Sequence, residues 1–346
     1  MKKLKVGIIG SGNIVVNGHL PAYLKRSNEV EVVAITGTTP EKLERLSKQY
    51  NIPNIFTDYH KMLKEVEPDV VSVCTPNYLH APASIAALQA GCHVFCEKPP
   101  ATTVKELKEM KRVSELNNRI ITFNYHHRFS SEVDALKKFS NNGEFGNIYS
   151  ARIQALRRRG IPGWGTFTNQ EIQGGGPLID IGIHMLDLCL YLMDFPEPKT
   201  VLGATHQRIG NKPGIGLMGS WNPEEYTVED SATGMIRFNN GASVSIETSY
   251  ALNIEEESVM NVHLFGDKGG ASVFPPKIFQ EKHANIVNTS LPFLEDVNKS
   301  ERSINHFIDC CLNRTKPLVT LEQSMIVQKI INGIYTSAET GKAVNF

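Results

Sequence analysis

A glycine-rich segment near the amino terminus has the residue types and spacing that hold a dinucleotide. Gly10-Ser11-Gly12-Asn13-Ile14 directly follows the apolar run Lys5–Ile9. The first glycine permits a tight turn, and the second lets the backbone approach a pyrophosphate, whose charge meets amides at the start of the next helix. Val15 stands where the fingerprint has a small residue. We predict that this segment binds a nicotinamide dinucleotide; the alternative is a plain structural turn.

The end of the second predicted strand, Val30–Ile35, bears on which dinucleotide is bound. An acid at that place would hold the ribose hydroxyls of NAD and repel a 2′-phosphate. The chain instead continues Thr36-Gly37-Thr38-Thr39-Pro40-Glu41-Lys42. Small hydroxyl residues and a lysine would tolerate or bind that phosphate, so we favour NADP over NAD. The expected contacts are Gly37, Thr38 and Lys42, unless Glu41 and Lys42 only solvate a helix start.

The glycine turn opens a regular alternation of short apolar strands and helices. Strands are predicted at 5–9, 30–35, 69–74, 93–96 and 119–123, with helices at 14–25, 41–50, 60–65, 81–90 and 104–117. Strands separated by helices of about ten residues form a parallel sheet, and right-handed crossovers make it doubly wound. Its ligand belongs at the carboxyl ends of the strands. We therefore predict a Rossmann domain over residues 1–123.

From about residue 124 the pattern changes to strands of alternating polarity. They are predicted at 148–156, 231–238, 242–250 and 258–265, with helices at 183–193 and 322–339 and loop-rich stretches at 206–227 and 277–300. Asn239-Asn240-Gly241 between two of these strands is a strong hairpin sequence. We predict that residues 124–346 form an α+β domain on a largely antiparallel open sheet.

Four segments, in this order and spacing, point to a known family. They are the glycine turn, Cys74-Thr75-Pro76-Asn77-Tyr78-Leu79-His80, Glu97-Lys98-Pro99 and Asp180-Ile181-Gly182-Ile183-His184. Over essentially its whole length the chain resembles the glucose–fructose oxidoreductase / inositol dehydrogenase / rhizopine catabolism (Gfo/Idh/MocA) family of NAD(P)-dependent oxidoreductases. The resemblance implies a dehydrogenase that acts on CH–OH donors.

The resemblance also implies further cofactor contacts at the ends of the third and fourth strands. The residues that match the family's cofactor-lining loops are Thr75, Pro76, Asn77, His80, Glu97 and Lys98. The segment from Thr36 to Lys42 looks like the NADP-binding version, in which the matching lysine meets the 2′-phosphate. We place Asn124, which follows the fifth strand, near the nicotinamide or at the domain junction.

Lys98, Asp180 and His184 match the family's catalytic trio. Oxidation of a secondary alcohol requires loss of the hydroxyl proton and transfer of a hydride, and the cofactor accepts the hydride. His184 can take the proton near neutral pH, and Lys98 can hydrogen-bond the reacting oxygen. Asp180 precedes His184 by four residues, so on a helix it can orient the histidine or hold a substrate hydroxyl. The alternative is a helix cap and a core histidine.

A loop in the second predicted domain combines cations with an aromatic ring. It reads Arg157-Arg158-Arg159-Gly160-Ile161-Pro162-Gly163-Trp164-Gly165. Arginine donates forked hydrogen bonds to hydroxyls or phosphate, and tryptophan offers a face for a sugar ring. Family members with such a loop look like sugar- or glycoside-oxidising enzymes. We expect a sugar, glycoside or cyclitol to contact Arg157, Arg159, Trp164 and Arg128, unless the arginines are only a solvated face.

Metal ligation and disulfides are not expected. His126 and His127 are adjacent and would point apart on a strand, which argues against a metal site. Cys92 and Cys96 bracket His93 on a predicted strand, where packing explains them. The six cysteines are interpreted as buried, reduced thiols.

The bulk composition excludes several kinds of partner. Lys plus Arg and Asp plus Glu are both 36, which gives no electrostatic reason to expect nucleic acid or an anionic membrane. The apolar run Val6–Ile9 is too short for a signal peptide, and no stretch is long enough for a membrane span. We predict a cytoplasmic protein that forms a homodimer or homotetramer through the open face of its carboxyl-terminal sheet.

The predicted function is hydride transfer between a secondary hydroxyl of a sugar, glycoside or cyclitol and the nicotinamide. Two alternatives remain open at this point. One is a sensor or scaffold that binds NADP without turnover, and the intact trio argues against it. The other is an imine or diene reductase on the same fold, and His184 favours alcohol oxidation over it.

Overall fold

The computed structural model describes residues 3–346, which form two compact units. The first contains the residues up to His126 and Asn298–Met325, and the second contains His127–Val297 and Ile326–Phe346. The expected boundary after residue 123 lies close to the first of these divisions. Residues 298–325, which we expected in the second domain, belong to the first unit instead.

The first unit contains the predicted doubly wound parallel sheet. Its strand order is β3-β2-β1-β4-β5-β6, and every pairing is parallel. The strands are β1 (Leu4–Ile9), β2 (Val30–Thr36), β3 (Asn54–Phe56), β4 (Val70–Val73), β5 (His93–Cys96) and β6 (Ile121–Phe123). Strand β3 was not predicted, because this three-residue edge strand is largely exposed and lacks a buried apolar run.

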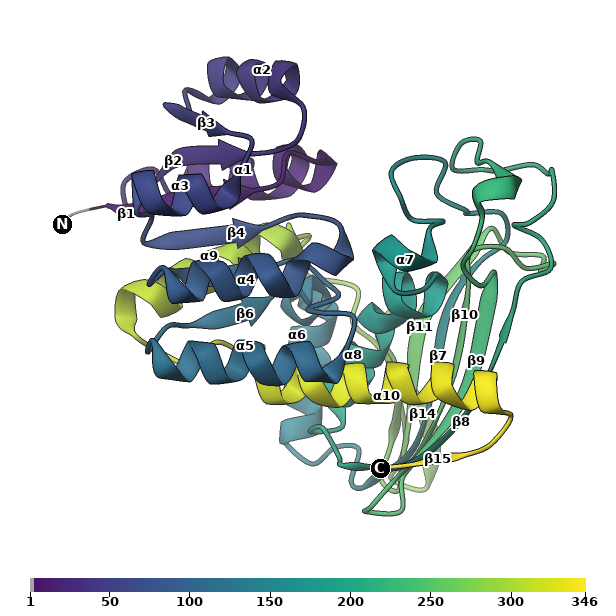
Figure 1. Ribbon diagram of the computed structural model, residues 1–346. Coiled ribbons are helices and arrows are strands. Elements are labelled where there is room, and N and C mark those ends of the chain that lie inside the picture. The colour runs from purple at the N-terminus through teal and green to yellow at the C-terminus, as the bar shows by residue number, and fades with distance from the viewer. Residues whose placement is uncertain (1–2) are drawn as a thin grey trace. The chain divides into compact units, whose positions relative to one another are not determined.

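Helices cover both faces of this sheet (Figure 1). They are η1 (Val15–His19), α1 (Leu20–Lys25), α2 (Pro40–Tyr50), α3 (Tyr59–Val66), η2 (Asn77–Leu79), α4 (His80–Gln89), α5 (Val104–Leu116) and α9 (Lys299–Asn313). The predicted helix 14–25 is a π turn followed by an α-helix, because Pro21 lacks the N–H that a continuous helix would use. Helix α9 was not predicted. Its Phe307 packs against Phe95 of β5, with ring centroids 5.3 Å apart.

The second unit contains a nine-stranded sheet in the order β14-β13-β12-β11-β7-β10-β9-β8-β15. The strands are β7 (Ile148–Arg157), β8 (Pro198–His206), β9 (Ser231–Phe238), β10 (Ser243–Ser249), β11 (Ser258–Gly266), β12 (Gly270–Ser272), β13 (Lys277–Lys282), β14 (Asn285–Ser290) and β15 (Val344–Asn345). All pairs are antiparallel except β7 with β10. The predicted hairpin at Asn239–Gly241 joins β9 to β10, with Gly241 at a φ of 87°.

Two strands correct the expectation of a loop over 277–300. Strands β13 and β14 form a hairpin at one edge of the sheet, and most of their residues are exposed. Such an edge has no buried face to impose alternating polarity on the sequence, so the pattern was polar and resembled a loop. The start of α9 also lies in this stretch.

The helices of the second unit position the candidate site. They are η3 (His126–Phe129), which includes the boundary residue, α6 (Ser131–Asn141), α7 (Gln170–Gln173), η4 (Leu178–Gly182), α8 (Ile183–Leu192), η5 (Pro223–Glu225) and α10 (Leu321–Thr340), which begins in the first unit. Among the described residues one helical segment, Gln170–Leu192, is long and apolar enough to cross a membrane. Of its apolar window 94% is buried, as expected for a core helix.

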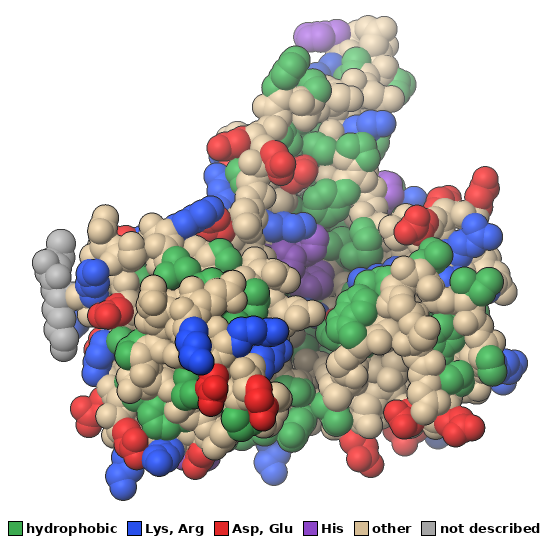
Figure 2. All heavy atoms as spheres, turned by 90° about the horizontal axis from the view of Figure 1, so that it is seen from above, with side chains coloured by type: hydrophobic (Ala, Val, Ile, Leu, Met, Phe, Trp, Pro, Cys, Tyr) green, Lys and Arg blue, Asp and Glu red, His purple; other side chains and the backbone are tan. Residues whose placement is uncertain are grey.

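One face of the second sheet packs on helices, and part of the other is exposed. Helix α8 contacts β7 and β11, η4 contacts β10, and Ile334 of α10 lies against Gly203 of β8. The apolar residues Leu202, Met235 and Phe265 of this sheet are 53%, 50% and 41% exposed to solvent. Elsewhere, Figure 2 shows positive and negative side chains interspersed over the face it draws, in keeping with the neutral composition.

Candidate functional site

The glycine turn has the geometry of a dinucleotide cradle. Gly10 has a φ of 115°, and a Cβ there would lie 2.3 Å from the carbonyl oxygen of Cys74, so only glycine fits. A Cβ on Gly12 would meet nothing within 4 Å, which leaves the backbone open to a ligand. Val15 is fully buried in the core. The departure from the fingerprint is therefore a packing contact and leaves the cradle intact.

The end of β2 lies beside this turn. The Gly10 N–H donates to the Thr36 carbonyl over 3.1 Å, and a Cβ on Gly37 would lie 2.6 Å from Ser11 Oγ. Thr38 is exposed and Lys42 is half-buried in the first turn of α2. The structure thus brings the predicted pyrophosphate and ribose segments together, with no acid at the tip of β2.

His80 joins the loops that follow β4 and β5. Its Nδ1 lies 2.6 Å from the Pro99 carbonyl oxygen and its Nε2 lies 2.8 Å from the Thr75 carbonyl oxygen. Burial lowers the pKa of His80, and the bonds to these two carbonyls oppose that shift. The ring is 1% exposed and links the two loops through these carbonyls. Its contact with the cofactor stays a prediction.

Glu97 is a buried carboxylate held by two side chains. Its Oε1 lies 2.8 Å from His19 Nε2, in the π turn after the glycine segment, and accepts a 2.8 Å bond from Asn124 Nδ2. His19 Nδ1 lies 3.1 Å from Ser72 Oγ. Burial alone would raise the pKa of Glu97, but the bonds from His19 and Asn124 lower it to about 2. Lys98 follows directly, so its backbone is anchored by a fixed, ionised neighbour.

In the second unit, Asp180 and His184 lie on consecutive helical segments. Asp180 belongs to η4, which continues into α8 with His184, and each residue is 8% exposed. Tyr250, just after β10, donates a 2.6 Å hydrogen bond to Asp180 Oδ2. Burial and the charge of Asp180 raise the pKa of Tyr250 well above its usual value, so the hydroxyl keeps its proton. This tyrosine was not predicted as a site residue.

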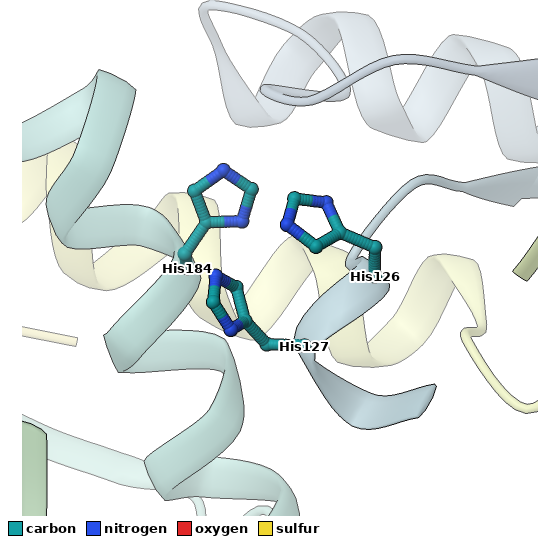
Figure 3. Close-up of side chains that lie close together, drawn as sticks. All are labelled: His126, His127 and His184. Atoms are coloured by element: carbon teal, nitrogen blue, oxygen red, sulfur yellow. The ribbon is translucent and has the colours of Figure 1, made fainter. Parts of the chain in front are cut away.

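The ring of His184 contacts that of His127. The two ring centroids are 5.2 Å apart in an edge-to-face arrangement (Figure 3), and His127 also contacts Phe274 at 5.9 Å. Figure 3 labels His126 as well, the last residue of the first unit. These two neighbouring histidines lie in the short helix η3 and not on a strand. The expectation that these two histidines lie on a strand was therefore wrong.

Arg128 is an interior ion-pair residue, which corrects its prediction as a substrate contact. Its Nε and Nη2 donate to Asp187 over 2.9 and 2.6 Å, and both side chains are fully buried. The guanidinium also lies 5.0 and 4.8 Å from the ring centroids of Tyr191 and Phe195. A buried cation needs such partners, and a group so enclosed has no surface left for a substrate.

The arginine–tryptophan loop is tied to neighbouring backbone. Arg157 donates to the Gly160 carbonyl and lies over the ring of Tyr250, 5.9 Å from its centroid. Arg159 donates to Leu252 O and, over 2.6 Å, to Asn253 Oδ1. Trp164 is 48% exposed. The loop therefore offers Trp164 as an open aromatic surface, and Arg157 connects it through Tyr250 to Asp180.

The family models cover nearly all of the chain. Residues 4–125 match the model described as "Oxidoreductase family, NAD-binding Rossmann fold", and residues 137–346 match "Oxidoreductase family, C-terminal alpha/beta domain" of Gfo/Idh/MocA. The chain belongs to the Gfo/Idh/MocA family of oxidoreductases. The predictions of the family, of the fold class and of an oxidoreductase are thereby confirmed.

Several relatives of the family are similar over most of their length. D-glucoside 3-dehydrogenase of Escherichia coli (strain K12) is 42% identical over 99% of this chain and 97% of its own. Levoglucosan dehydrogenase of Pseudarthrobacter phenanthrenivorans is 30% identical over 72% of this chain and 68% of its own. The solved complex of levoglucosan dehydrogenase with NADH and levoglucosan has a TM-score of 0.85 at 23% identity, covering 99% of both chains. That likeness shows the shared fold.

The carboxyl edge of the first sheet fits the dinucleotide that the family's Rossmann fold binds. Beyond the open space at Gly12, two buried polar atoms at this edge, Thr75 Oγ1 and Asn124 Oδ1, have no hydrogen-bond partner among the described residues. Thr75 and Asn124 follow β4 and β6, at the strand ends where such a fold holds its ligand. Buried polar atoms of this kind call for a partner, which a bound cofactor would supply.

Proposed function

We propose that this chain is an NADP-dependent dehydrogenase that oxidises the C3 hydroxyl of a D-glucoside. The observation that supports it most is the pair Asp180 and His184 on joined helical segments, with Asp180 fixed by Tyr250 over 2.6 Å. The similarity to D-glucoside 3-dehydrogenase over the whole chain supports the choice of substrate. The exposed Trp164 offers a surface on which a pyranose ring stacks.

In this proposal the residues of the chain manage the proton and the geometry. The nicotinamide, when bound, accepts the hydride. His184 takes the hydroxyl proton as general base. Asp180, held by Tyr250, accepts a hydrogen bond from the sugar or orients His184. Lys98, anchored beside Glu97, donates to the reacting oxygen and stabilises negative charge as it develops.

NADP is proposed over NAD because of the loop between β2 and α2. A carboxylate is missing from the tip of β2, Thr38 is exposed, and Lys42 lies in the first turn of α2. A 2′-phosphate would meet no repulsion there, and the lysine supplies a positive charge.

A homodimer or homotetramer in the cytoplasm is also part of the proposal. The exposed apolar residues Leu202, Met235 and Phe265 support association through the second sheet. The apolar run near the amino terminus is strand β1 in the middle of the first sheet, which supports a structural role for it. Light scattering of the purified protein and of a Met235→Asp variant tests the assembly, and cell fractionation tests the location.

The decisive experiment is a substrate panel with both cofactors. Methyl glucosides, free aldoses, inositols and sugar phosphates are incubated with the protein and NADP or NAD, and absorbance at 340 nm is followed. Turnover of glucosides, lost in His184→Ala while cofactor still binds, is the expected result. Tight cofactor binding without turnover of any compound would refute the dehydrogenase proposal and favour a sensor.

A further inference from the structure

The glycines just before η4, Gly175 and Gly176, leave space for Glu229 and Tyr335. A Cβ on Gly175 would lie 2.1 Å from the Tyr335 hydroxyl oxygen, and one on Gly176 would lie 2.6 Å from the Glu229 carbonyl oxygen. These contacts leave no space for any larger residue. The glycines therefore allow Glu229 and Tyr335 to approach the backbone at the start of η4.

The carboxylate of Glu229 caps that start. Its Oε2 accepts a 2.8 Å hydrogen bond from the Gly176 N–H, and its Oε1 accepts a 3.2 Å bond from the Leu178 N–H. The first N–H groups of a helix have no partner within the helix, so a carboxylate placed there satisfies them and favours the helix dipole. Tyr335 of α10 donates to Glu229 Oε1 over 2.9 Å and fixes the carboxylate from the other side.

Hydrogen bonds at Gly176 connect this cap to the candidate catalytic residue Asp180. The Asp180 N–H donates to the Gly176 carbonyl over 3.0 Å, so the peptide units on both sides of Gly176 connect Glu229 to Asp180. The same helical path continues into α8 and His184. Glu229 is 7% exposed, and its described contacts are with backbone N–H groups and Tyr335.

We propose that Glu229 is a positioning residue for the dehydrogenase reaction. Glu229 fixes the backbone at the start of η4 and thereby the positions of Asp180 and His184. Tyr335 holds the Glu229 carboxylate in place by its hydrogen bond. This inference rests on the proposed function for its catalytic consequence. Its structural content, an anchored segment from Gly176 to His184, stands independently of which substrate is used.

Glu229→Gln tests the proposal with almost no change in side-chain size. The amide keeps one oxygen but presents an NH2 group to one of the backbone N–H groups that needs an acceptor. We expect kcat to fall about 10–100-fold, because small displacements of catalytic groups have effects of this size. The dissociation constant of NADP should stay unchanged, and amide hydrogen exchange should accelerate between residues 176 and 184.

Two further variants complete the design. Glu225→Gln makes the same chemical change on an exposed side chain and should leave kcat and exchange as in the wild type. Tyr335→Phe removes one donor to Glu229 while both backbone bonds remain, so a few-fold loss of kcat is expected. This variant also decides the matter if Glu229→Gln does not fold: wild-type kcat and exchange in Tyr335→Phe would then count against the proposal.

The readouts separate this inference from the proposed function. If Glu229→Gln folds and shows wild-type kcat and wild-type exchange at 176–184, the positioning role is overturned. If the wild type oxidises no sugar, the proposed function fails, and hydrogen exchange still decides whether Glu229 anchors the segment.

Discussion

Two buried glutamates, one in each unit, differ in the direction of their pKa shift. Burial tends to raise the pKa of both Glu97 and Glu229. At Glu97 the bonds from His19 and Asn124 reverse this effect and lower the pKa to about 2. At Glu229 the backbone N–H groups and Tyr335 only moderate it, so the pKa stays raised. Two glutamates at similar burial thus have opposite pKa shifts because their hydrogen-bond partners differ.

The difference corresponds to two structural tasks. Glu97 is kept ionised by His19, which lies on the helix that begins at the glycine turn, so the cofactor cradle and the strand end at Lys98 are linked through one carboxylate. Glu229 meets peptide dipoles at a helix start and fixes a backbone. The first task requires the charge itself, whereas the second requires mainly the acceptor geometry.

The largest effect is expected from removing the partner of Glu97. His19→Leu leaves a buried carboxylate with Asn124 as its remaining described side-chain donor, and the loss of one member of a buried pair costs about 3–5 kcal/mol. Urea unfolding at pH 7 measures it. Ser72→Ala removes the contacts of Ser72 Oγ with His19 Nδ1 and with the Tyr23 hydroxyl but leaves His19 on Glu97, so it should cost less, about 1–2 kcal/mol. Equal losses in the two variants would contradict the assignment of His19 as the partner that stabilises the charge.

The two glutamates should also give opposite slopes of stability against pH. Because the pKa of Glu97 falls from 4.5 to about 2 on folding, it contributes roughly 3 kcal/mol above pH 4.5, which is lost as pH falls toward 2. The raised pKa of Glu229 makes its contribution complete below pH 4.5 and lost as pH rises through the folded-state pKa.

Unfolding of Glu97→Gln and Glu229→Gln across pH 3–7, relative to wild type, measures this difference. With rising pH, Glu97→Gln should become progressively less stable than wild type and Glu229→Gln progressively more stable relative to it. Parallel curves for the two variants would show that the environments of the two carboxylates do not differ as described.

Much of the first unit could be predicted from the sequence because its determinants are local. The glycine turn and the buried strands are contiguous patterns, and five of the six strands were found. Helix α9 was not predicted, although Ile304, Phe307, Ile308 and Cys311 follow helical spacing and all lie in the core. The edge hairpin β13–β14 was not predictable in the same way, because its exposed polar residues give no periodic pattern.

The supporting residues of the site could not be found from the sequence, because their roles depend on partners far along the chain. His19 and Glu97 are 78 residues apart, and Tyr250 and Asp180 are 70 apart. For Arg128 the prediction named a site residue where the structure has a core residue. The sequence around an arginine does not distinguish a substrate contact from a buried ion pair, and the partner Asp187 lies 59 residues further along the chain.

Removing one hydrogen bond from Asp180 and one from Glu97 compares the roles of these two carboxylates more finely. Tyr250→Phe removes the Tyr250 donor to Asp180 and should lower kcat about tenfold, with a loss of about 1–3 kcal/mol of stability for the buried bond. Asn124→Ala removes one of two donors to Glu97 and should cost about 1 kcal/mol of stability, with a smaller effect on kcat. Steady-state kinetics and urea unfolding of both variants test this. The reverse pattern would exchange the roles assigned to the two carboxylates.

The smallest effect is expected at Lys42, which lies outside both carboxylate networks. Lys42→Ala should lower kcat/KM with NADP by about fivefold, as for a partly exposed charge contact, and leave the value with NAD unchanged. Stability and kcat at saturating cofactor should match the wild type, because Lys42 touches neither His19–Glu97 nor Glu229. A Lys42→Arg variant keeps the charge and should retain the NADP preference. Equal losses with both cofactors would place the effect in the fold of α2 and remove the argument for NADP.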